Sequence, residues 1–291
     1  MPPPLIAVVG PVESALLAAF VDHYQGLGVN RFLLAFHFPD GTGDTVTEEL
    51  MQACHVIVGK PEILSTGPWH ESTNAALRDE LRRRAGPGWH LIADIDEFQT
   101  YPTTISEAIE KARRSRRLVV TGLMLDRVAA DGSLGSWSPG RGIDNAYPLG
   151  GFVTHRLLRA DPRKIVLAHS SAPLARGNHH SPGHPGVNEP PVPVHHFKWR
   201  RGVLAYLRNR AEMFASGQWR EETPAMRTEA QRVFKHLAAH GGRFHVDSPL
   251  LDLKPVSLRE TPAWWTAEST AINDNWLPPH LVDGQLNRCC R

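Results

Sequence analysis

The order of apolar and polar positions in the first hundred residues predicts strands and helices in alternation. Short apolar runs, each closed by a turn or a polar stretch, predict buried strands at 5–9, 31–36, 55–58 and 89–93. Amphipathic stretches between them, with apolar residues on one helical stripe, predict helices at 13–24, 45–53 and 70–84. This regular alternation indicates an α/β unit with a parallel sheet and right-handed crossovers.

The pattern continues less regularly in the second half of the chain. Thr104 and Glu107 have the spacing of a capping box, which predicts a helix that ends near Arg117. Further apolar runs predict strands at 118–128, 151–158 and 164–168, and amphipathic stretches predict helices at about 201–216 and 224–240. The stretches 132–148 and 177–193 lack a period and are expected to be loops, the first of them functional. The residues after 241 are expected to wrap the surface.

Composition narrows the class of protein. The 291 residues hold 32 Lys and Arg against 30 Asp and Glu, a net charge of +2, so a nucleic-acid binder acting through a basic surface is not expected. Three cysteines, at positions 54, 289 and 290, have neither the number nor the spacing of a disulfide framework or a four-thiolate zinc site. The first residues lack a signal-peptide pattern, and no apolar run approaches the ~18 residues that span a bilayer. We therefore expect a cytoplasmic protein without an integral membrane segment.

Three carboxylates directly follow the apolar run 89–93. With the side-chain period of a strand, Asp94 and Asp96 point to one side while Ile95 points into the core. Paired acids at the carboxyl end of a parallel strand lie where open α/β sheets bind their ligands. The two would repel each other, and a divalent cation would remove that repulsion and supply the charge that a diphosphate needs. The alternative is that these acids are ordinary solvated residues at the end of a strand. The buried run 89–93 before them and the additional carboxylate of Glu97 make this alternative less favoured.

Histidine is the outlier of the composition. Six of the 16 histidines lie between positions 169 and 196, namely His169, His179, His180, His184, His195 and His196. Neighbours in an extended chain point in opposite directions, so one member of each adjacent pair is expected to face away from any metal. An isolated histidine is more often an ordinary core or surface residue, which is the preferred interpretation for His169 and His184.

These motifs together resemble the GT-A glycosyltransferases. The resemblance rests on the stretch from Glu13 through Gly28, on 39–44, and on 89–98, whose Asp-Ile-Asp-Glu-Phe end is most similar to the family 2 and family 92-like branch. It spans about residues 5–210 and departs from the family's pattern after the first strand, where Pro-Val-Glu replaces the familiar Asn-Glu. The fold it implies is a mostly parallel, Rossmann-like nucleotide-sugar-binding sheet flanked by helices, followed by C-terminal helices.

The resemblance divides the chain into three parts and implies donor-binding residues. Residues 1–128 form the nucleotide-sugar half, 129–217 the acceptor and metal-completing half of the same domain, and 218–291 the C-terminal helix and tail. Five residues fall at positions that contact the donor: Glu13 and Asp40 at the uracil and ribose, Asp94 at the ribose or sugar, and Lys198 and Arg200 at the diphosphate.

A metal site follows from the same resemblance. Asp96 falls at the direct ligand, and members of the family commonly complete the site with a downstream histidine. His196 is the first candidate for this ligand, and His180 or His179 is the next. An imidazole nitrogen suits Mn²⁺ better than Mg²⁺, so Mn²⁺ is the expected cofactor, with Mg²⁺ as the alternative.

The implied activity is transfer of a hexose-type sugar from a nucleotide-diphosphate donor, a UDP-sugar by resemblance, to a hydroxyl of a small molecule or glycan. An inverting enzyme needs a carboxylate that takes the proton of this hydroxyl. Asp144, in the loop after the strand 118–128, is the candidate, and an ordinary turn aspartate is an equal alternative. The tail either shapes the acceptor side or mediates a homodimer. The sugar, the acceptor and the stereochemistry stay open.

Three other functions fit parts of the sequence. A haloacid-dehalogenase-type phosphatase also places Asp-x-Asp after a strand, but its motif needs Thr or Val where Phe98 stands. A zinc-dependent hydrolase could use the histidine-rich loop, although no His-Glu-x-x-His pair is present. A non-catalytic nucleotide-sugar-binding or carbohydrate-binding module would use the same fold.

Overall fold

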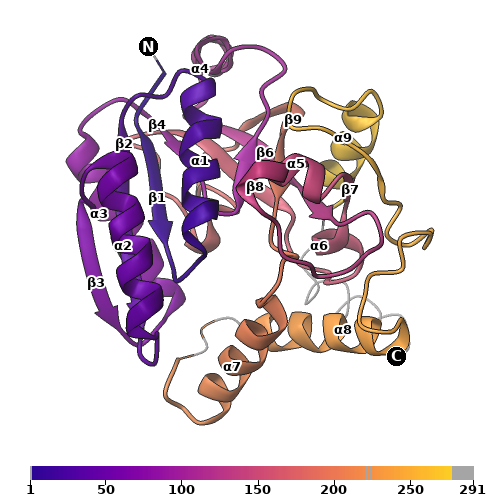
Figure 1. Cartoon of the computed structure of the whole chain (residues 1–291). Coiled ribbons are helices and arrows are strands. Elements are labelled where there is room, and N and C mark those ends of the chain that lie inside the picture. Colours follow the sequence, from indigo (N-terminus) through magenta and orange to yellow (C-terminus); the bar gives the residue numbers. More distant parts are fainter. Residues whose placement is uncertain (1, 221, 223–224, 277–291) are drawn as a thin grey trace, which may run out of the picture.

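The computed structural model describes residues 2–220, 222 and 225–276. Within these residues ten strands form one sheet, with helices on its faces and α7 and α8 below it (Figure 1). The strands are β1 (Leu5–Val9), β2 (Phe32–Pro39), β3 (Ile63–Gly67), β4 (Trp89–Ile92), β5 (Glu97–Gln99), β6 (Val119–Val128), β7 (Leu149–Gly151), β8 (Arg163–His169), β9 (Val187–His196) and β10 (Lys254–Pro255).

The described helices are of two kinds. The α-helices are α1 (Ser14–Gly26), α2 (Asp44–Val58), α3 (Glu71–Ala85), α4 (Ile105–Arg114), α5 (Ile143–Ala146), α6 (Val153–Arg156), α7 (Val203–Ala215), α8 (Ala225–Ala239) and α9 (Trp265–Asn275). Two short 3₁₀ helices, Pro139–Arg141 and Arg176–Asn178, lie in the loops. No helix of the described part is long and apolar enough to cross a membrane.

The sheet is mixed, and its two halves differ in direction. Its main path runs β10-β7-β6-β8-β4-β1-β2-β3. The half formed by β4, β1, β2 and β3 is parallel, whereas β8 is antiparallel to both β4 and β6. β9 pairs in parallel with β6 and antiparallel with β5. The predicted α/β fold is confirmed, and the parallel half is the one that sequence alternation predicts best.

The side-chain period of β1 explains why both faces of the sheet are covered. Leu5, Ala7 and Val9 face the core shared with α1 and α2, and Ile6 faces the core shared with α3. Figure 1 shows α1 and α2 in front of this half of the sheet. Because β1 is buried on both faces, it reads as a continuous apolar run rather than an alternating one.

Two of the predicted strands are wrong. Residues 55–58 complete α2, whose buried Leu50 and Cys54 lie on the same helical stripe. The strand that follows is β3, an edge strand whose alternating half-exposure leaves too few apolar residues for recognition. The strand predicted at 151–158 is also wrong, because the helix α6 begins at Val153. Its first turn is held by Asp126, which accepts hydrogen bonds from the backbone N and Oγ1 of Thr154 at 2.6 and 2.9 Å.

Two further expectations are wrong, namely that 177–193 is a loop throughout and that the residues after 241 only wrap the surface. β9 begins at Val187, and its three prolines hide it from propensity reasoning. It nevertheless pairs with β6 over Gly122–Asp126, where the bare Cα of Gly122 permits a close approach. The tail contains α9, which places Trp265 in the core with its Nε1 donating to Pro191 O at 2.7 Å. Cys289 and Cys290 lie outside the described residues.

Candidate functional site

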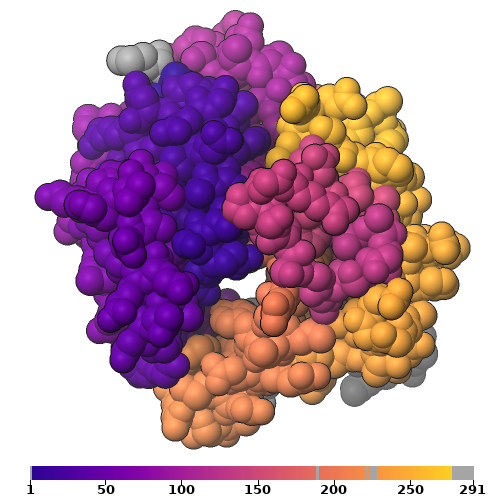
Figure 2. Space-filling view, viewed as in Figure 1, coloured from indigo at the N-terminus to yellow at the C-terminus, as the bar shows by residue number. Residues whose placement is uncertain are grey.

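A cleft opens at the carboxyl ends of the parallel strands. The chain leaves β1, β2 and β4 at this edge, where Glu13, Asp40 and the acidic stretch 94–97 follow the strands. Figure 2 shows a hollow between the indigo N-terminal residues, the pink segment after β6 and the orange segment after β9. Open α/β sheets commonly bind ligands at this edge, and Glu13, Asp40 and the stretch 94–97 follow strands that end there.

Asp96 and His196 meet in this region, although they are a hundred positions apart in the chain. His196 Nε2 lies 3.7 Å from Asp96 Oδ2, and His196 Nδ1 lies 3.0 Å from Asp126 Oδ1. β9 positions the histidine, and Phe197 N donates to Asp96 O at 2.8 Å, which ties the end of β9 to the acidic turn. Burial alone would lower the pKa of His196, but Asp96 and Asp126 together raise it.

Asp126 is a buried carboxylate that sequence analysis did not single out. It has no exposed surface, and Trp199 Nε1 donates to its Oδ1 at 3.1 Å in addition to the contacts from Thr154 and His196. These donors fix the orientation of His196 and Trp199. The signal was present in the sequence, because Asp126 and Arg127 are adjacent charges inside an otherwise apolar strand.

Asp94 belongs to a separate charged cluster beside this pair. Lys164 Nζ lies 2.7 Å from Asp94 Oδ2, 2.6 Å from Glu97 Oε1 and 3.0 Å from Gly177 O. Burial would raise the pKa of Asp94, but Lys164 lowers it. Burial and then the charge of Asp94 raise the pKa of Glu97 to about 7. Lys164 therefore holds one carboxylate ionised and stabilises the other.

The acidic stretch itself is a turn rather than a continuation of β4. Glu97 N donates to Asp94 O at 2.9 Å, and β5 begins at Glu97. The strand period that predicted Asp94 and Asp96 on one side therefore does not apply here. The turn gives the two carboxylates different partners, Lys164 for Asp94 and His196 for Asp96.

Glu13, which follows β1, and Arg200, which follows β9, form an ion pair. Arg200 Nε donates to Glu13 Oε1 at 2.6 Å, and Nη2 donates to Oε2 at 3.3 Å. Arg200 is 8% exposed, and its buried Nη1 has no hydrogen-bond partner among the described residues. A buried guanidinium N–H without an acceptor is costly, which marks this atom as one that a bound anion would satisfy.

The other two predicted donor residues lie apart from this ion pair. Lys198 packs its Nζ 5.2 Å from the centre of the Trp199 ring. Burial lowers the pKa of Lys198, and Glu229 of α8 is the strongest charge that opposes this. Asp40 is exposed at the end of β2.

Asp144 is held by contacts to the sheet and to the C-terminal segment. Arg127 Nη2 donates to Asp144 Oδ1 at 2.7 Å, and Leu258 N and Ser257 Oγ lie 3.2 and 3.1 Å from Asp144 Oδ2. Arg127 is fully buried and also contacts His195 Nδ1 at 3.0 Å. Asp144 thus connects the loop after β6 to β6 itself and to residues 257–258.

The members of each histidine pair have different surroundings, although only His195 and His196 lie in a strand and His179 follows a 3₁₀ helix. His195 and His196 are neighbours in β9, but His195 contacts Arg127 while His196 contacts Asp126. His179 Nδ1 contacts Arg163 O at 2.9 Å, and burial followed by the charge of Lys164 lowers its pKa to about 4. His180 is exposed. Among the described residues, no group of three or more His, Cys, Asp or Glu side chains is arranged to hold a metal ion.

Comparison with known proteins finds similarity in structure only. No protein-family model and no curated protein matches the sequence. The mannosyltransferase PcManGT from Pyrobaculum calidifontis, solved with GDP-Man and Mn²⁺, is 12% identical with a TM-score of 0.39 over 99% of this chain and 80% of that chain. TarS from S. aureus is 10% identical with a TM-score of 0.32 over 85% of this chain and 45% of that chain.

HddC from Yersinia pseudotuberculosis, complexed with GMP-PN, is 10% identical with a TM-score of 0.28 over 45% of this chain. The match spans 60% of HddC, so this chain covers less than two thirds of both HddC and TarS. These TM-scores are too low for any property of those proteins to be transferred to this chain.

Proposed function

We propose that this chain is a metal-dependent glycosyltransferase of the GT-A type, which moves a hexose-type sugar from a UDP-sugar to a hydroxyl acceptor. The observation that supports this most strongly is the meeting of Asp96 and His196 at the carboxyl edge of the sheet, 3.7 Å apart. The motifs that resemble the GT-A family supply the reaction class, and the orphaned Arg200 Nη1 supports an anionic ligand beside this pair.

The residues present fit a divalent cation held in part by its substrate. If His196 Nδ1 carries the proton and donates it to Asp126, the lone pair of Nε2 is directed towards Asp96, which is the arrangement that metal-binding histidines require. Two protein ligands leave the remaining positions to diphosphate oxygens and water. One nitrogen and one carboxylate oxygen favour Mn²⁺ over Mg²⁺.

In this proposal the chain's own residues bind the donor and prepare its leaving group. Arg200, oriented by Glu13, directs Nη1 towards a diphosphate oxygen, while Lys164 keeps Asp94 ionised and fixed for the sugar or ribose hydroxyls. A cation at Asp96 and His196 would neutralise charge that develops on the diphosphate. The bond from the anomeric carbon to the diphosphate breaks, the leaving oxygen keeps the electron pair, and the acceptor oxygen forms the new bond. The proton of the acceptor hydroxyl passes to the departing diphosphate.

Asp144 is better suited to holding the loop than to taking the acceptor's proton. Its oxygens already accept hydrogen bonds from Arg127, Ser257 and Leu258, so lone pairs that a general base needs are occupied. We therefore assign Asp144 a positioning role for the loop 132–148. This changes the role inferred from the sequence while keeping the residue in the site.

Calorimetry of UDP binding tests the proposal. Wild-type protein should bind UDP much more tightly with Mn²⁺ than with EDTA, and Asp96→Asn should abolish the difference. Asp22→Asn is the control, because it makes the same change of carboxylate to amide at an exposed position of α1 that has no part in the proposed site. UDP binding that ignores Mn²⁺, or an Asp96→Asn protein that retains the metal effect, would reject the proposal.

A further inference from the structure

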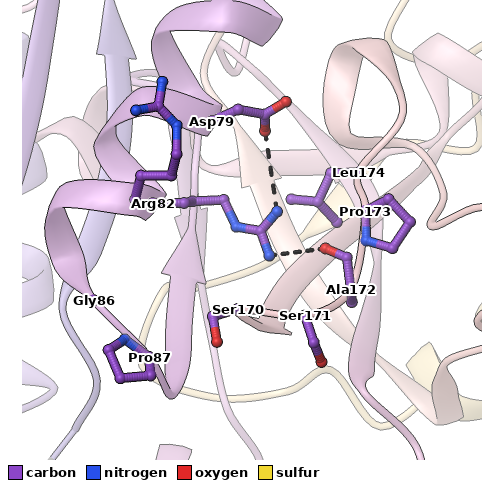
Figure 3. Close-up of a pocket in the computed structure, with 10 residues that line it drawn as sticks. Asp79, Arg82, Gly86, Pro87, Ser170, Ser171, Ala172, Pro173 and Leu174 are labelled. Carbon is purple, nitrogen blue, oxygen red and sulfur yellow. Dashed lines mark hydrogen bonds and ion pairs between the residues drawn. The ribbon is translucent and has the colours of Figure 1, made fainter.

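A second pocket lies at the opposite edge of the sheet from the candidate site. Pro87, just before β4 begins, and Ser170, just after β8 ends, lie in its wall (Figure 3). The C-terminal half of α3, the Gly86-Pro87 turn and residues 170–174 form its walls, and its volume is about 540 Å³. Because the candidate site follows the other end of β4, the two cavities are separated by the length of that strand.

Arg82 places a poorly compensated positive charge in this pocket. Its side chain is 8% exposed, and its Nη2 donates to the carbonyls of His169 and Ala172 at 2.8 and 2.9 Å. The carboxylate of Asp79 lies 4.0 Å from Arg82 Nη1, beyond hydrogen-bond distance, and no described residue accepts from Arg82 Nε. Figure 3 shows the guanidinium between Asp79 and Ala172. Buried charges in proteins are normally paired at short distance. The carboxylate that faces Arg82 lies 4.0 Å away, so this guanidinium lacks a close counter-ion.

Asp79 is not free to supply that counter-ion, because it serves a second arginine. Arg78 Nε donates to Asp79 Oδ1 at 2.9 Å, so one carboxylate faces two buried guanidinium groups. From position 78 to 85 the helix carries four arginines and two acids, a formal charge of 4 − 2 = +2. Arg83 also lines the pocket and pairs with Glu80 at its outer edge.

The neighbouring elements add a hydroxyl group to this pocket rather than further charge. His90 of β4 is 1% exposed, and its pKa falls to about 4, first through burial and then through the charges of Arg82, His169 and Arg31, so this imidazole is neutral near pH 7. Ser170 Oγ accepts from Gly88 N at 3.1 Å, which leaves its own O–H available to donate. Ser171 Oγ lies 2.8 Å from His169 Nδ1, which already accepts from Ser171 N, so the Ser171 O–H is used there. The pocket therefore offers the cations of Arg82 and Arg83 and the hydroxyl donor of Ser170.

We propose that this pocket is a binding site for a small organic phosphate, with the phosphate held by Arg82, Arg83 and the hydroxyl of Ser170. Guanidinium groups match the geometry of phosphate oxygens and provide charge-assisted hydrogen bonds. The volume exceeds what a phosphate group needs, and the remaining wall contains Pro87 and Leu174, which suits an organic body of modest size. This site is independent of the proposed donor site.

Calorimetry in EDTA at constant ionic strength tests the proposal, with inorganic phosphate, glycerol 3-phosphate and acetate as probes. We expect saturable binding of glycerol 3-phosphate, weaker binding of inorganic phosphate, and no binding of acetate. Arg83→Gln should weaken binding about threefold or more, whereas Arg84→Gln should not. Arg83 and Arg84 both pair with Glu80, but only Arg83 lines the pocket, so the two variants form a matched pair.

Two further measurements distinguish phosphate binding in this pocket from phosphate binding in the proposed donor site. Arg82→Gln should weaken binding about tenfold or more, because it removes a charge-assisted contact. Arg83→Gln should leave the Mn²⁺-dependent binding of UDP unchanged, because Arg83 lines this pocket and has no part in the proposed donor site. Absence of saturable phosphate binding, equal losses from Arg83→Gln and Arg84→Gln, or a loss of UDP binding in Arg83→Gln would each overturn the proposal.

Discussion

Replacing Lys164 by Met should destabilise the protein strongly, because this ammonium is the shared partner of two carboxylates. Lys164 is 3% exposed, and its Nζ contacts Asp94, Glu97 and a backbone carbonyl within 3.0 Å. Methionine fills similar volume but leaves Asp94 and the buried Glu97 beside each other without a cation. Breaking a buried pair by removing one partner costs about 3–5 kcal/mol of the free energy of unfolding.

Urea unfolding followed by tryptophan fluorescence at pH 8 and pH 5.5 measures this cost. The pKa of Glu97 is already raised to about 7 in the wild-type protein, and losing Lys164 raises it further. An acid with a raised folded-state pKa loses stability as the pH rises, so the deficit of Lys164→Met should be larger at pH 8 than at pH 5.5.

Lys254→Met is the matched control for this substitution. Lys254 also contacts two carboxylates, Asp252 at 2.9 Å and Glu268 at 2.5 Å, but its side chain is 31% exposed. Surface pairs contribute about 0–1 kcal/mol, so this variant should lose little. If Lys164→Met loses less than about 1 kcal/mol, or no more than Lys254→Met, the role given to Lys164 is wrong.

Three further predictions concern other parts of the molecule. Asp144→Asn should lower the unfolding free energy by about 3 kcal/mol because buried Arg127 loses its carboxylate; an equally stable variant whose kcat falls at least about 100-fold would instead make Asp144 the general base. Burial lowers the pKa of His90 from 6.5 to about 4, so the free energy of unfolding of the wild-type protein should drop by roughly 3 kcal/mol as the pH falls through this range. In urea titrations, His90→Leu should lose this dependence of stability on pH. A variant that keeps the same pH dependence would contradict the role given to His90. Calorimetry should show that His196→Ala weakens Mn²⁺-dependent UDP binding at least about tenfold while His180→Ala leaves it unchanged; equal effects would remove His196 as the ligand.

Periodicity predicted the parts of the fold that depend on local pattern. β1, α1 and the capped helix α4 were visible because each buries its apolar residues in a regular register. The capping box at Thr104 and Glu107 is confirmed, with the Thr104 side chain accepting from Glu107 N. The segments that went wrong depend on tertiary contacts instead. β9 carries prolines that lower its strand propensity, and α9 has two buried residues, Trp265 and Ser269, which give no clear helical period.

The candidate site shows the same division between local and distant information. Asp94 and Asp96 were conspicuous because they end an apolar run, and His196 because it lies in a cluster of histidines. Asp126 and Lys164 were missed, although each is a charged residue inside an apolar strand. Their partners lie 70 positions away in the chain, so only the pairing of β6 with β9 and of β4 with β8 brings them together. A buried strand that carries a charge is therefore the signal to follow.

Release of UDP from UDP-sugars tests the central claim most directly. Wild-type protein with Mn²⁺ and a screen of hydroxyl acceptors should release UDP with at least one donor, and slow hydrolysis should occur without an acceptor. Asp96→Asn and His196→Ala should each abolish this release, and Asp96→Asn should do so while keeping the free energy of unfolding within about 1 kcal/mol of the wild-type value. UDP binding without release from any donor would indicate a binding protein, and release that persists in both variants would contradict the proposed metal site.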